Sequence, residues 1–419
     1  MAKRVIIIGA GAAGLCAAVS AAKGGADVTV LEHTGRAGRK LLNTGNGRCN
    51  LTNENLSPEN YYGGPDSFAW KVISGFGFDE TIDFFSDMSL KTKSIGGYVY
   101  PASEQATAVL EILLAKCRCL NVRIIRDVTV KEISSFSGGF KVFLDRTEAG
   151  TDPGKDFPSA DEAAVCESLI ICTGGMSYAK TGSDGSGFKL AASLGHTVNR
   201  PLPALCALHS DDKFLKTAAG ARWNGEFKLL ADGVCVWEES GNIQFNPDGI
   251  SGIPVMNASR FVSRALKKKQ ECRAQIDFLK DAGPQEISGF IDSGAKNNPE
   301  FSACELLCGI LNKRIVLSVL KKAGIKPDEP CGRLRGEKEI LHLIKCLSLK
   351  INATDGFERA QITTGGISTD EIDPRTLSSK KIPGLYFAGE MIDVDGMCGG
   401  YNLQFAASSG VIAGRNAAQ

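Results

Sequence analysis

The sequence has no excess of either charge, since its 48 Lys and Arg residues nearly balance its 47 Asp and Glu residues. Such a chain has no broad positive field with which to attract nucleic acid or an anionic membrane surface. Its N-terminal apolar stretch is interrupted by glycines, is far shorter than a membrane span, and is followed by no small-residue cleavage site. We therefore expect a cytoplasmic protein with a small-molecule substrate and with no nucleic-acid or membrane partner. The sequence indicates no oligomeric state.

Histidine is scarce, and the cysteines are scattered. The four histidines lie far apart in the sequence, and none has an obvious serine or cysteine partner for nucleophilic catalysis. The 14 cysteines include no C-x-x-C, and the pairs Cys117/Cys119 and Cys304/Cys308 have no further histidine or cysteine at metal spacing. These absences argue against a disulfide scaffold, a dithiol reductase and a metal site. We expect reduced cysteines and no bound metal.

At the N-terminus the sequence VIIIGAGAAG has the pattern of a nucleotide-binding turn. Residues 5–8 are apolar and β-prone, which predicts a buried parallel strand, and Gly9, Gly11 and Gly14 follow with G-x-G-x-x-G spacing. Gly9 permits the tight turn, Gly11 lets the backbone approach a pyrophosphate, and Gly14 lets the helix over residues 15–23 pack closely. The amides at the start of that helix would face the phosphates. This order of elements predicts a dinucleotide-binding α/β domain.

The next segment continues the same pattern. A second strand is expected over residues 27–31, and Glu32 at its end lies at the right distance to accept hydrogen bonds from ribose hydroxyls. Residues 33–53 are too rich in glycine, asparagine and basic side chains to form one helix or strand. We expect this loop to follow a diphosphate and ribityl chain, where these basic and amide side chains would offset charge or bond the ligand: Arg36, Arg39, Lys40, Arg48, Asn46 and Asn50.

The loop also carries a family resemblance. Residues 38–53, GRKLLNTGNGRCNLTN, resemble the signature of a bacterial family of FAD-dependent oxidoreductases, the BaiN-like flavoproteins related to aminoacetone oxidase. Residues 360–369 and 382–414 resemble the closing motifs of that family. The resemblance implies a Rossmann-like FAD-binding domain of the glutathione-reductase superfamily, with an inserted β-rich and helical substrate or cap domain.

The motif and the resemblance together give a set of expected FAD contacts. By resemblance, Val130 would meet the adenine through its backbone and Glu390 would hold a ribityl hydroxyl. A helix that starts near Asn402 would place its N-terminus at the flavin and stabilise negative charge on the reduced ring. The full set is Gly9, Gly11, Ala13, Gly14, Glu32, Arg39, Lys40, Gly45, Gly47, Arg48, Asn50, Val130, Thr173, Gly174, Gly175, Gly389, Glu390, Gly400, Tyr401, Asn402 and Leu403.

The remaining pattern predicts how the chain divides. Residues 1–200 and 358–419 would form the two parts of the FAD-binding domain. Residues 201–357 would form the inserted domain, β-rich over 201–255 and 347–357 and helical over 256–346, which we expect to roof the flavin and form the substrate pocket. Within the first part we expect helices over 67–90 and 104–119, a small antiparallel meander over 122–125, 128–133 and 140–144, and a loose excursion over 148–163. Within the insertion, strands are expected over 226–237 and 242–245.

The inserted segment also departs from the family. The family usually shows Phe-Thr-His before a glycine turn, whereas this chain has Phe245, Asn246 and Pro247. The missing histidine means that a relative's substrate does not transfer directly to this chain.

If FAD is bound, the chemistry belongs to the flavin, and no catalytic side chain is identified from the sequence. Tyr401 is a candidate proton donor near the ring. The leading hypothesis is an FAD-dependent oxidoreductase that reduces a small apolar substrate, such as a steroid or bile-acid enone, with NAD(P)H as electron source. No second G-x-G-x-x-G is present to bind the nicotinamide cofactor, so its binding would be transient. The alternatives are a flavin amine oxidase that uses oxygen and a flavoprotein that binds and modifies tRNA.

Overall fold

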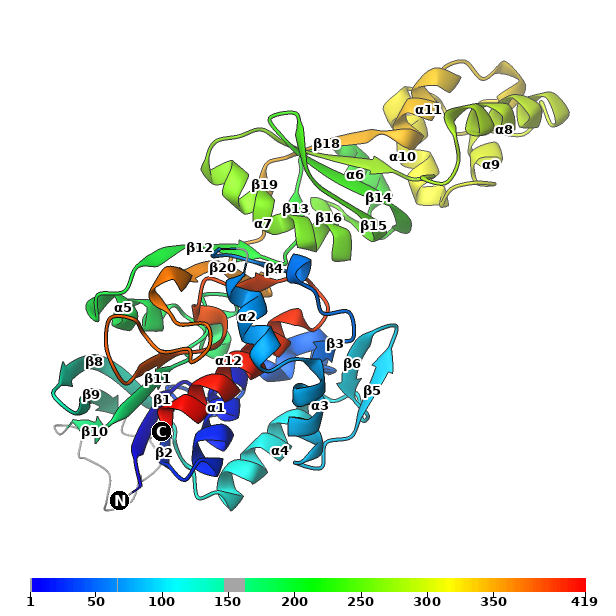
Figure 1. Cartoon of the computed structure of the whole chain (residues 1–419). Helices are drawn as coiled ribbons and strands as arrows, with labels where there is room; N and C mark the ends of the chain where they lie inside the picture. The colour runs from blue at the N-terminus through cyan, green and yellow to red at the C-terminus, as the bar shows by residue number, and fades with distance from the viewer. Residues whose placement is uncertain (1, 66, 147–162) are drawn as a thin grey trace. The chain divides into compact units, whose positions relative to one another are not determined.

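The computed structural model describes residues 2–65, 67–146 and 163–419. Most of the excursion expected over 148–163 therefore lies outside the described residues. The chain forms two compact units: unit 1 is Met1–Leu202 with Gln361–Gln419, and unit 2 is Pro203–Ala360. The segments that surround unit 2 in the sequence thus fold together into one body (Figure 1).

Unit 1 is built on a five-stranded parallel sheet in the order β21-β11-β1-β2-β7. Its central strands are nearly continuous apolar runs, as is typical of parallel strands that are buried on both faces. The chain leaves β1 toward β2 on one side, and β11 lies on the other, so the crevice at the carboxyl end of β1 is a topological switch point, where ligands bind in such sheets. The strands are β1 Arg4–Ile8, β2 Asp27–Leu31, β7 Arg123–Ile125, β11 Ser168–Ile171 and β21 Leu385–Phe387.

The first and last long helices of unit 1, α1 (Ala12–Lys23) and α12 (Tyr401–Ala417), pack side by side (Figure 1). A Cβ atom on Gly410 would lie 2.3 Å from the carbonyl oxygen of Ala13, and one on Gly414 would lie 2.3 Å from that of Ala17. Only glycine permits this approach. The other helices of unit 1 are α2 Phe68–Gly75, α3 Phe78–Ser86, α4 Ala106–Cys119 and α5 Ser186–Ser193.

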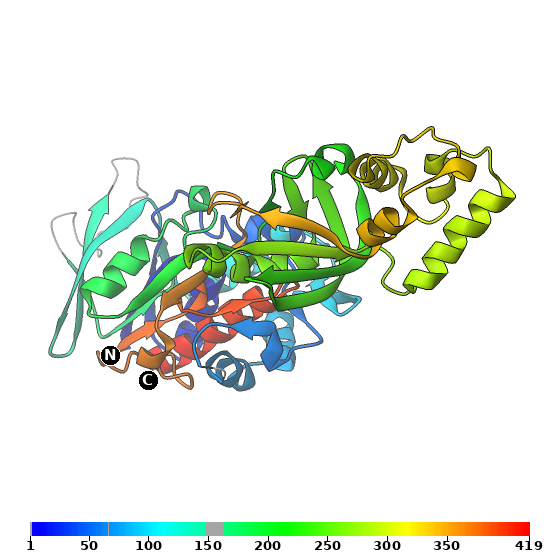
Figure 2. The ribbon, with the colours of Figure 1, turned by 90° about the horizontal axis from the view of Figure 1, so that it is seen from above.

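One strand of the predicted meander belongs elsewhere. Strand β7 pairs parallel with β2 in the main sheet, so the expectation of an antiparallel strand over 122–125 is wrong. A three-residue apolar strand carries no pattern that distinguishes a parallel edge from a meander. The antiparallel sheet is instead β10-β9-β8, seen at one edge of unit 1 in Figure 2, with β8 Val128–Phe136, β9 Gly139–Arg146 and β10 Ala164–Cys166.

Short strands and single-turn helices complete unit 1. The sheet β3-β6-β5 and the pairs β12-β20 and β22-β4 are formed by β3 Thr52–Asn53, β4 Tyr61–Tyr62, β5 Thr92–Ile95, β6 Tyr98–Pro101, β12 Val198–Ala204, β20 Ile362–Ile367 and β22 Asp395–Gly396. The 3₁₀ segments are η1 Leu41–Gly47, η2 Pro58–Asn60, η3 Ala179–Thr181, η5 Thr369–Glu371 and η6 Gly389–Met391.

Unit 2 has its own seven-stranded sheet in the order β18-β17-β14-β15-β16-β13-β19. Two expectations fail here. The strand expected over 226–237 is broken by a hairpin turn at Asp232 and Gly233, a known turn pair. Strand β17 lies at residues where only helices were expected, although its buried and exposed residues alternate. The strands are β13 Leu208–His209, β14 Arg222–Ala231, β15 Val234–Asn246, β16 Gly249–Ser251, β17 Cys272–Asp277, β18 Leu347–Ile351 and β19 Ala353–Thr354.

The helices of unit 2 divide into two groups. In Figure 1, α6 and α7 lie along the sheet, whereas α8 to α11 gather beyond one end of it. None of the helices in the described parts of either unit has the length and apolar composition to cross a bilayer. The helices of unit 2 are α6 Lys213–Ala218, α7 Ile253–Lys267, α8 Pro284–Asn297, α9 Ala303–Leu307, α10 Lys313–Ala323 and α11 Glu337–Lys345, with the 3₁₀ segment η4 Cys331–Arg333.

Candidate functional site

Unit 1 contains a cavity of about 250 Å³ at the carboxyl end of β1. Residues from the turn between β1 and α1, from the end of β2 and from the start of α12 all line it. Its wall is therefore formed by both ends of the chain. The predicted contact residues that line it are Gly9, Gly11, Ala13, Glu32, Arg39, Lys40, Val130, Thr173, Gly174, Gly389, Glu390, Asn402 and Leu403.

The glycine turn leaves room for a ligand at one position only. A Cβ on Gly9, whose φ is +103°, would lie 2.6 Å from the carbonyl oxygen of Cys172, and a Cβ on Gly14 would lie 1.9 Å from that of Gly9. These two glycines are required by the packing of the protein itself. A Cβ on Gly11 would meet no protein atom within 4 Å, and this residue lines the cavity. Gly11 therefore keeps space open for something other than the protein.

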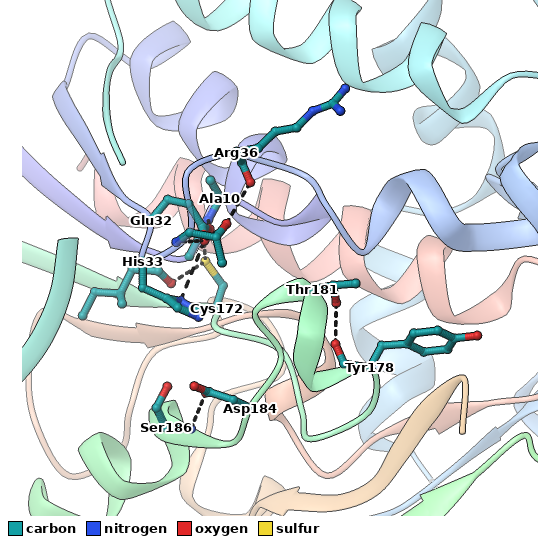
Figure 3. A network of polar contacts seen from close by, with 12 residues as sticks. Ala10, Glu32, His33, Arg36, Cys172, Tyr178, Thr181, Asp184 and Ser186 are labelled. Atoms are coloured by element: carbon teal, nitrogen blue, oxygen red, sulfur yellow. Dashed lines mark hydrogen bonds and ion pairs between the residues drawn. The ribbon is translucent and has the colours of Figure 1, made fainter. Parts of the chain in front are cut away.

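The carboxylate of Glu32 is fixed in position beside this turn (Figure 3). It is only 7% exposed, and its Oε2 accepts a hydrogen bond from the amide of Ala10 at 2.9 Å. Its Oε1 accepts hydrogen bonds from the amide and the hydroxyl of Thr34, both at 2.8 Å. The ring of His33 lies beside it, with Nδ1 3.7 Å from Oε1. A carboxylate so held is placed to accept hydrogen bonds from ribose hydroxyls without first reorganising.

Two residues that line the cavity have a buried hydroxyl group with no hydrogen-bond partner among the described residues. The two oxygen atoms are Oγ1 of Thr173, just beyond the end of β11, and Oγ of Ser183, in the loop before α5. An unsatisfied buried polar group costs about 1–3 kcal/mol. The free space at Gly11 and the fixed carboxylate of Glu32 fit a dinucleotide cofactor.

A half-buried ion pair lies farther along the same cavity. Nζ of Lys40 is 2.5 Å from Oε2 of Glu390, and Oε1 of Glu390 accepts a hydrogen bond from the amide of Thr363 at 2.9 Å. Both members of the pair line the cavity. The pair adds no net charge, so this part of the wall offers hydrogen-bonding groups rather than a field for phosphate.

The other predicted residues do not line this cavity: Gly14, Gly45, Gly47, Arg48, Asn50, Gly175, Gly400 and Tyr401. Several of them meet one another instead. A Cβ on Gly400 would lie 2.9 Å from Oδ1 of Asn50, a buried oxygen without a hydrogen-bond partner. The guanidinium of Arg48 stacks over the ring of Tyr100, 4.3 Å from its centroid, and pairs with Glu104 at 2.5 Å. Arg48 is thus already paired with a carboxylate within the protein.

Two candidate reactive groups have specific surroundings. The ring of Tyr401 packs edge-on against Tyr61 with a centroid distance of 6.0 Å, and the Tyr61 hydroxyl donates to the backbone oxygen of Tyr401 at 3.3 Å. Burial raises the pKa of Tyr61 well above its usual range. Burial also raises the pKa of Cys49 to about 12, so this thiol stays protonated at neutral pH and is a poor nucleophile.

Part of the cavity wall was not predicted from the sequence. His33 follows Glu32 directly, and residues 181–186 follow the segment that begins with the two glycines after β11. In Figure 3, Asp184 from this second segment accepts a hydrogen bond from the amide of Ser186 at 2.9 Å. Both groups could have been found from their place in the sequence after a strand, because loops after neighbouring parallel strands meet at one edge of the sheet. The missed lining residues with polar side chains are His33, Thr44, Thr129, Thr181, Ser183, Asp184, Ser186 and Gln361, whereas Arg36, which was expected in the ligand loop, does line the cavity.

Comparison with known proteins agrees with this geometry. Residues 3–416 match the family model described as "HI0933-like protein Rossmann domain". The chain belongs to the HI0933-like family. The predicted family is therefore confirmed, as are the Rossmann-like α/β fold and the assignment as an FAD-dependent oxidoreductase.

Individual members of the HI0933-like family match along nearly the whole chain. A protein of Clostridium scindens named 3-dehydro-bile acid delta(4,6)-reductase is 37% identical over 99% of both chains. A protein of Escherichia coli named ribosomal RNA dihydrouridine synthase is 29% identical over 96% of this chain and 95% of its own. Among solved structures, a 3-ketosteroid-Δ4-(5α)-dehydrogenase of Rhodococcus jostii is 17% identical, with a TM-score of 0.49 over 100% of this chain and 97% of that one.

Proposed function

We propose that this HI0933-like protein uses FAD and NAD(P)H to reduce a carbon–carbon double bond conjugated to a carbonyl group in a small apolar substrate of the steroid type. The observation that carries the proposal is the cavity at the carboxyl end of β1 in unit 1. The first glycine turn and the last helix both line it, and Gly11 leaves open space there beside the fixed carboxylate of Glu32.

The names of the relatives support the type of reaction. Double bonds at positions 4 and 6 of a 3-dehydro bile acid form one system conjugated to the 3-carbonyl group, and the double bond lost when uridine becomes dihydrouridine is conjugated to a ring carbonyl. Two relatives with unlike substrates therefore share reduction of an activated double bond. The steroid type is favoured here because the relative with 37% identity carries that name and because the net charge of +1 offers RNA no attraction.

The residues of the cavity have distinct tasks in this proposal. The turn at Gly9 and Gly11 and the N-terminus of α1 would receive the pyrophosphate, since free helix amides favour an anion. Glu32 would accept hydrogen bonds from the adenosine ribose. When bound, FAD supplies hydride transfer between the donor and the substrate. Asn402 and Leu403 at the start of α12 would border the flavin end, where the positive end of the helix dipole favours negative charge.

The nicotinamide donor and the remaining assignments belong to the same proposal. Since the sequence has no second G-x-G-x-x-G, NAD(P)H would bind transiently and leave after it has reduced the flavin. All 14 cysteines are free thiols, which suits a reducing compartment such as the cytoplasm. We keep residues 201–357 as the substrate-selecting domain and Tyr401 as the candidate proton donor.

Anaerobic half-reactions test the proposal. The purified holoprotein is mixed with NADH, NADPH or a primary amine, and bleaching of the flavin absorbance is followed. We expect bleaching by at least one nicotinamide cofactor and none by the amine. The reduced protein is then offered a 3-oxo-Δ4 steroid or an unmodified ribosomal RNA fragment, and the steroid should restore the oxidised spectrum. Bleaching by amines alone, or reoxidation by the RNA and not by the steroid, would contradict the proposed substrate.

A further inference from the structure

Two cysteines of unit 2 lie close together on the surface of α9. Cys304 is half-buried in the first turn of this helix, and Cys308 is exposed at its C-terminal cap. Their Sγ atoms are 4.0 Å apart, and neither takes part in a disulfide. The pair lies in a unit that does not contain the nucleotide cavity, and the proposed reaction does not use it.

The helix fixes the two thiols on one side. Residues four positions apart are neighbours on a helical surface, and the amide of Cys308 donates to the carbonyl oxygen of Cys304 at 3.0 Å. The opposite side of α9 is anchored in the core of unit 2 by Ala303, Leu306 and Leu307. The separation of the thiols is therefore set by the fold.

The spacing favours a bridging atom over a direct disulfide. Cβ atoms at helical spacing i and i+4 are about 5–6 Å apart, whereas a disulfide needs them about 3.5–4.5 Å apart. A disulfide would thus require the end of α9 to unwind. Two sulfur atoms 4.0 Å apart can instead both lie about 2.3 Å from one soft ion, the usual zinc–thiolate distance, with an S–ion–S angle of about 120°.

We propose that Cys304 and Cys308 form a bidentate thiolate site for a soft, thiophilic centre, of which trivalent arsenic and Cd²⁺ are representative. Thiolates select such soft ions. The described residues contain no group of three or more His, Cys, Asp or Glu side chains placed to hold a metal ion. The rest of the coordination sphere would therefore come from the ligand itself or from solvent, and the site is a chelate of two protein atoms.

Binding of an arsenical at this site is balanced without an oxidant. With phenylarsine oxide, two arsenic–sulfur bonds form, the arsenic–oxygen double bond breaks, and the two thiol protons leave with the oxygen as water. Burial, and then the neighbouring Cys304, raise the pKa of Cys308, so that this thiol loses its proton when the ligand binds rather than beforehand.

The test uses the FAD-loaded protein and phenylarsine oxide, with Cd²⁺ as a second probe. Loss of free thiols, the mass of the adduct and its mapped position are measured for the natural chain and for the variants Cys304→Ser and Cys308→Ser. The variant Cys235→Ser is the matched control, because Cys235 is exposed on β15, which contains no second cysteine. Flavin content and the melting curve of each variant establish that it is folded.

We expect the natural chain and Cys235→Ser to bind one equivalent of at least one probe, with loss of two thiols and reversal by a dithiol but not by a monothiol. Each substitution at Cys304 or Cys308 should weaken this binding roughly 100-fold or more, because a chelate loses its second, intramolecular bond. Equal binding by the two variants would overturn the proposal. So would the absence of a two-thiol adduct with either probe, or an adduct that maps to other cysteines.

Discussion

The two units treat their buried hydroxyl groups differently. In unit 2 the hydroxyls of Ser259, Ser263 and Ser318 donate to backbone carbonyl oxygens at 2.6, 2.7 and 2.9 Å. In unit 1 the hydroxyls of Thr173 and Ser183 are equally removed from solvent but have no partner. Among the described residues, all four buried hydroxyls without a partner lie in unit 1, on Thr52, Ser168, Thr173 and Ser183, and two of these residues line the cavity. The buried hydroxyls of unit 1, which contains the cavity, are thus the less completely hydrogen-bonded of the two sets.

Glycines lie in two kinds of setting, against backbone or facing open space, and each unit contains both kinds. In unit 1 glycines allow backbone segments to approach one another around the cavity, as at Gly9 beside Cys172, and keep the cavity open at Gly11. In unit 2 some glycines, such as Gly289 in α8 and Gly356 after β19, face no protein atom within 4 Å and lie on the surface. A substitution by a larger residue should therefore affect cofactor binding at the glycines around the cavity and almost nothing at those on the surface.

The largest expected effect is that of Gly11→Val. The backbone at Gly11 is extended, with φ of −81° and ψ of −170°, so valine is tolerated by the backbone, and its side chain would fill space reserved for the ligand. We expect the dissociation constant for FAD to rise about 100-fold, which is ~2.7 kcal/mol, while the apoprotein stays folded.

The matched control for Gly11→Val is Gly356→Val, which should bind FAD as the natural chain does. Titration of the apoproteins by quenching of flavin fluorescence measures both variants, and circular dichroism checks their folding. Normal affinity in Gly11→Val would contradict the placement of the cofactor at this turn.

Removal of the Glu32 carboxylate should have the next largest effect. Glu32→Ala deletes the acceptor for ribose and leaves the amide of Ala10 without its bond. A hydrogen bond to a charged group contributes about 1.5–3 kcal/mol, so FAD should bind roughly 10–100-fold more weakly. The same titration measures the loss of affinity. Glu32→Gln keeps one acceptor oxygen, so its affinity for FAD should lie between those of the natural chain and Glu32→Ala. If Glu32→Ala binds as tightly as the natural chain, the carboxylate has no role in binding.

Cofactor removal should separate the two units in stability. A ligand present at 100 times its dissociation constant stabilises the folded state by about 2.7 kcal/mol. Differential scanning calorimetry should show one thermal transition for each unit. Because the cavity lies in unit 1, removal of FAD should lower the transition temperature of unit 1 and leave that of unit 2 unchanged. An equal shift of both transition temperatures, or no shift in either, would contradict the prediction that FAD stabilises unit 1 alone.

The smallest effects concern two helical glycines. Gly414→Ala would place a Cβ 2.3 Å from the carbonyl oxygen of Ala17, and such overpacking costs about 1–3 kcal/mol. Gly289→Ala in α8 meets no protein atom and should stabilise unit 2 by about 0.5–1 kcal/mol, because alanine is the better helix residue. Urea unfolding measures both. A neutral Gly414→Ala would contradict the packing of α1 against α12, and destabilisation by Gly289→Ala would contradict the open surroundings of Gly289.

The sequence predicts the nucleotide-binding half of the molecule better than the rest. The strand at 5–8, the three glycines and Glu32 form one local pattern with one known use, so the α/β fold and the cavity wall at the β1–α1 turn and at the end of β2 follow from it. Val130 and Glu390, which also line the cavity, were expected only from the family resemblance. The pairing of strands β7 and β17 was not predicted, because each strand is short and its partners are far away in sequence. The side chains at 181–186 were missed because their place in the wall depends on where the loop after β11 folds.

The account rests on one bound flavin nucleotide that contacts both ends of the chain. Hydrogen exchange of the apoprotein, followed as FAD is added, tests this most directly. We predict that the segment around residues 9–15 and the segment around residues 400–406 gain protection together, at one equivalent of FAD, while β14 and β15 in unit 2 do not change. Protection of only one of the two segments, or protection at different FAD concentrations, would contradict it.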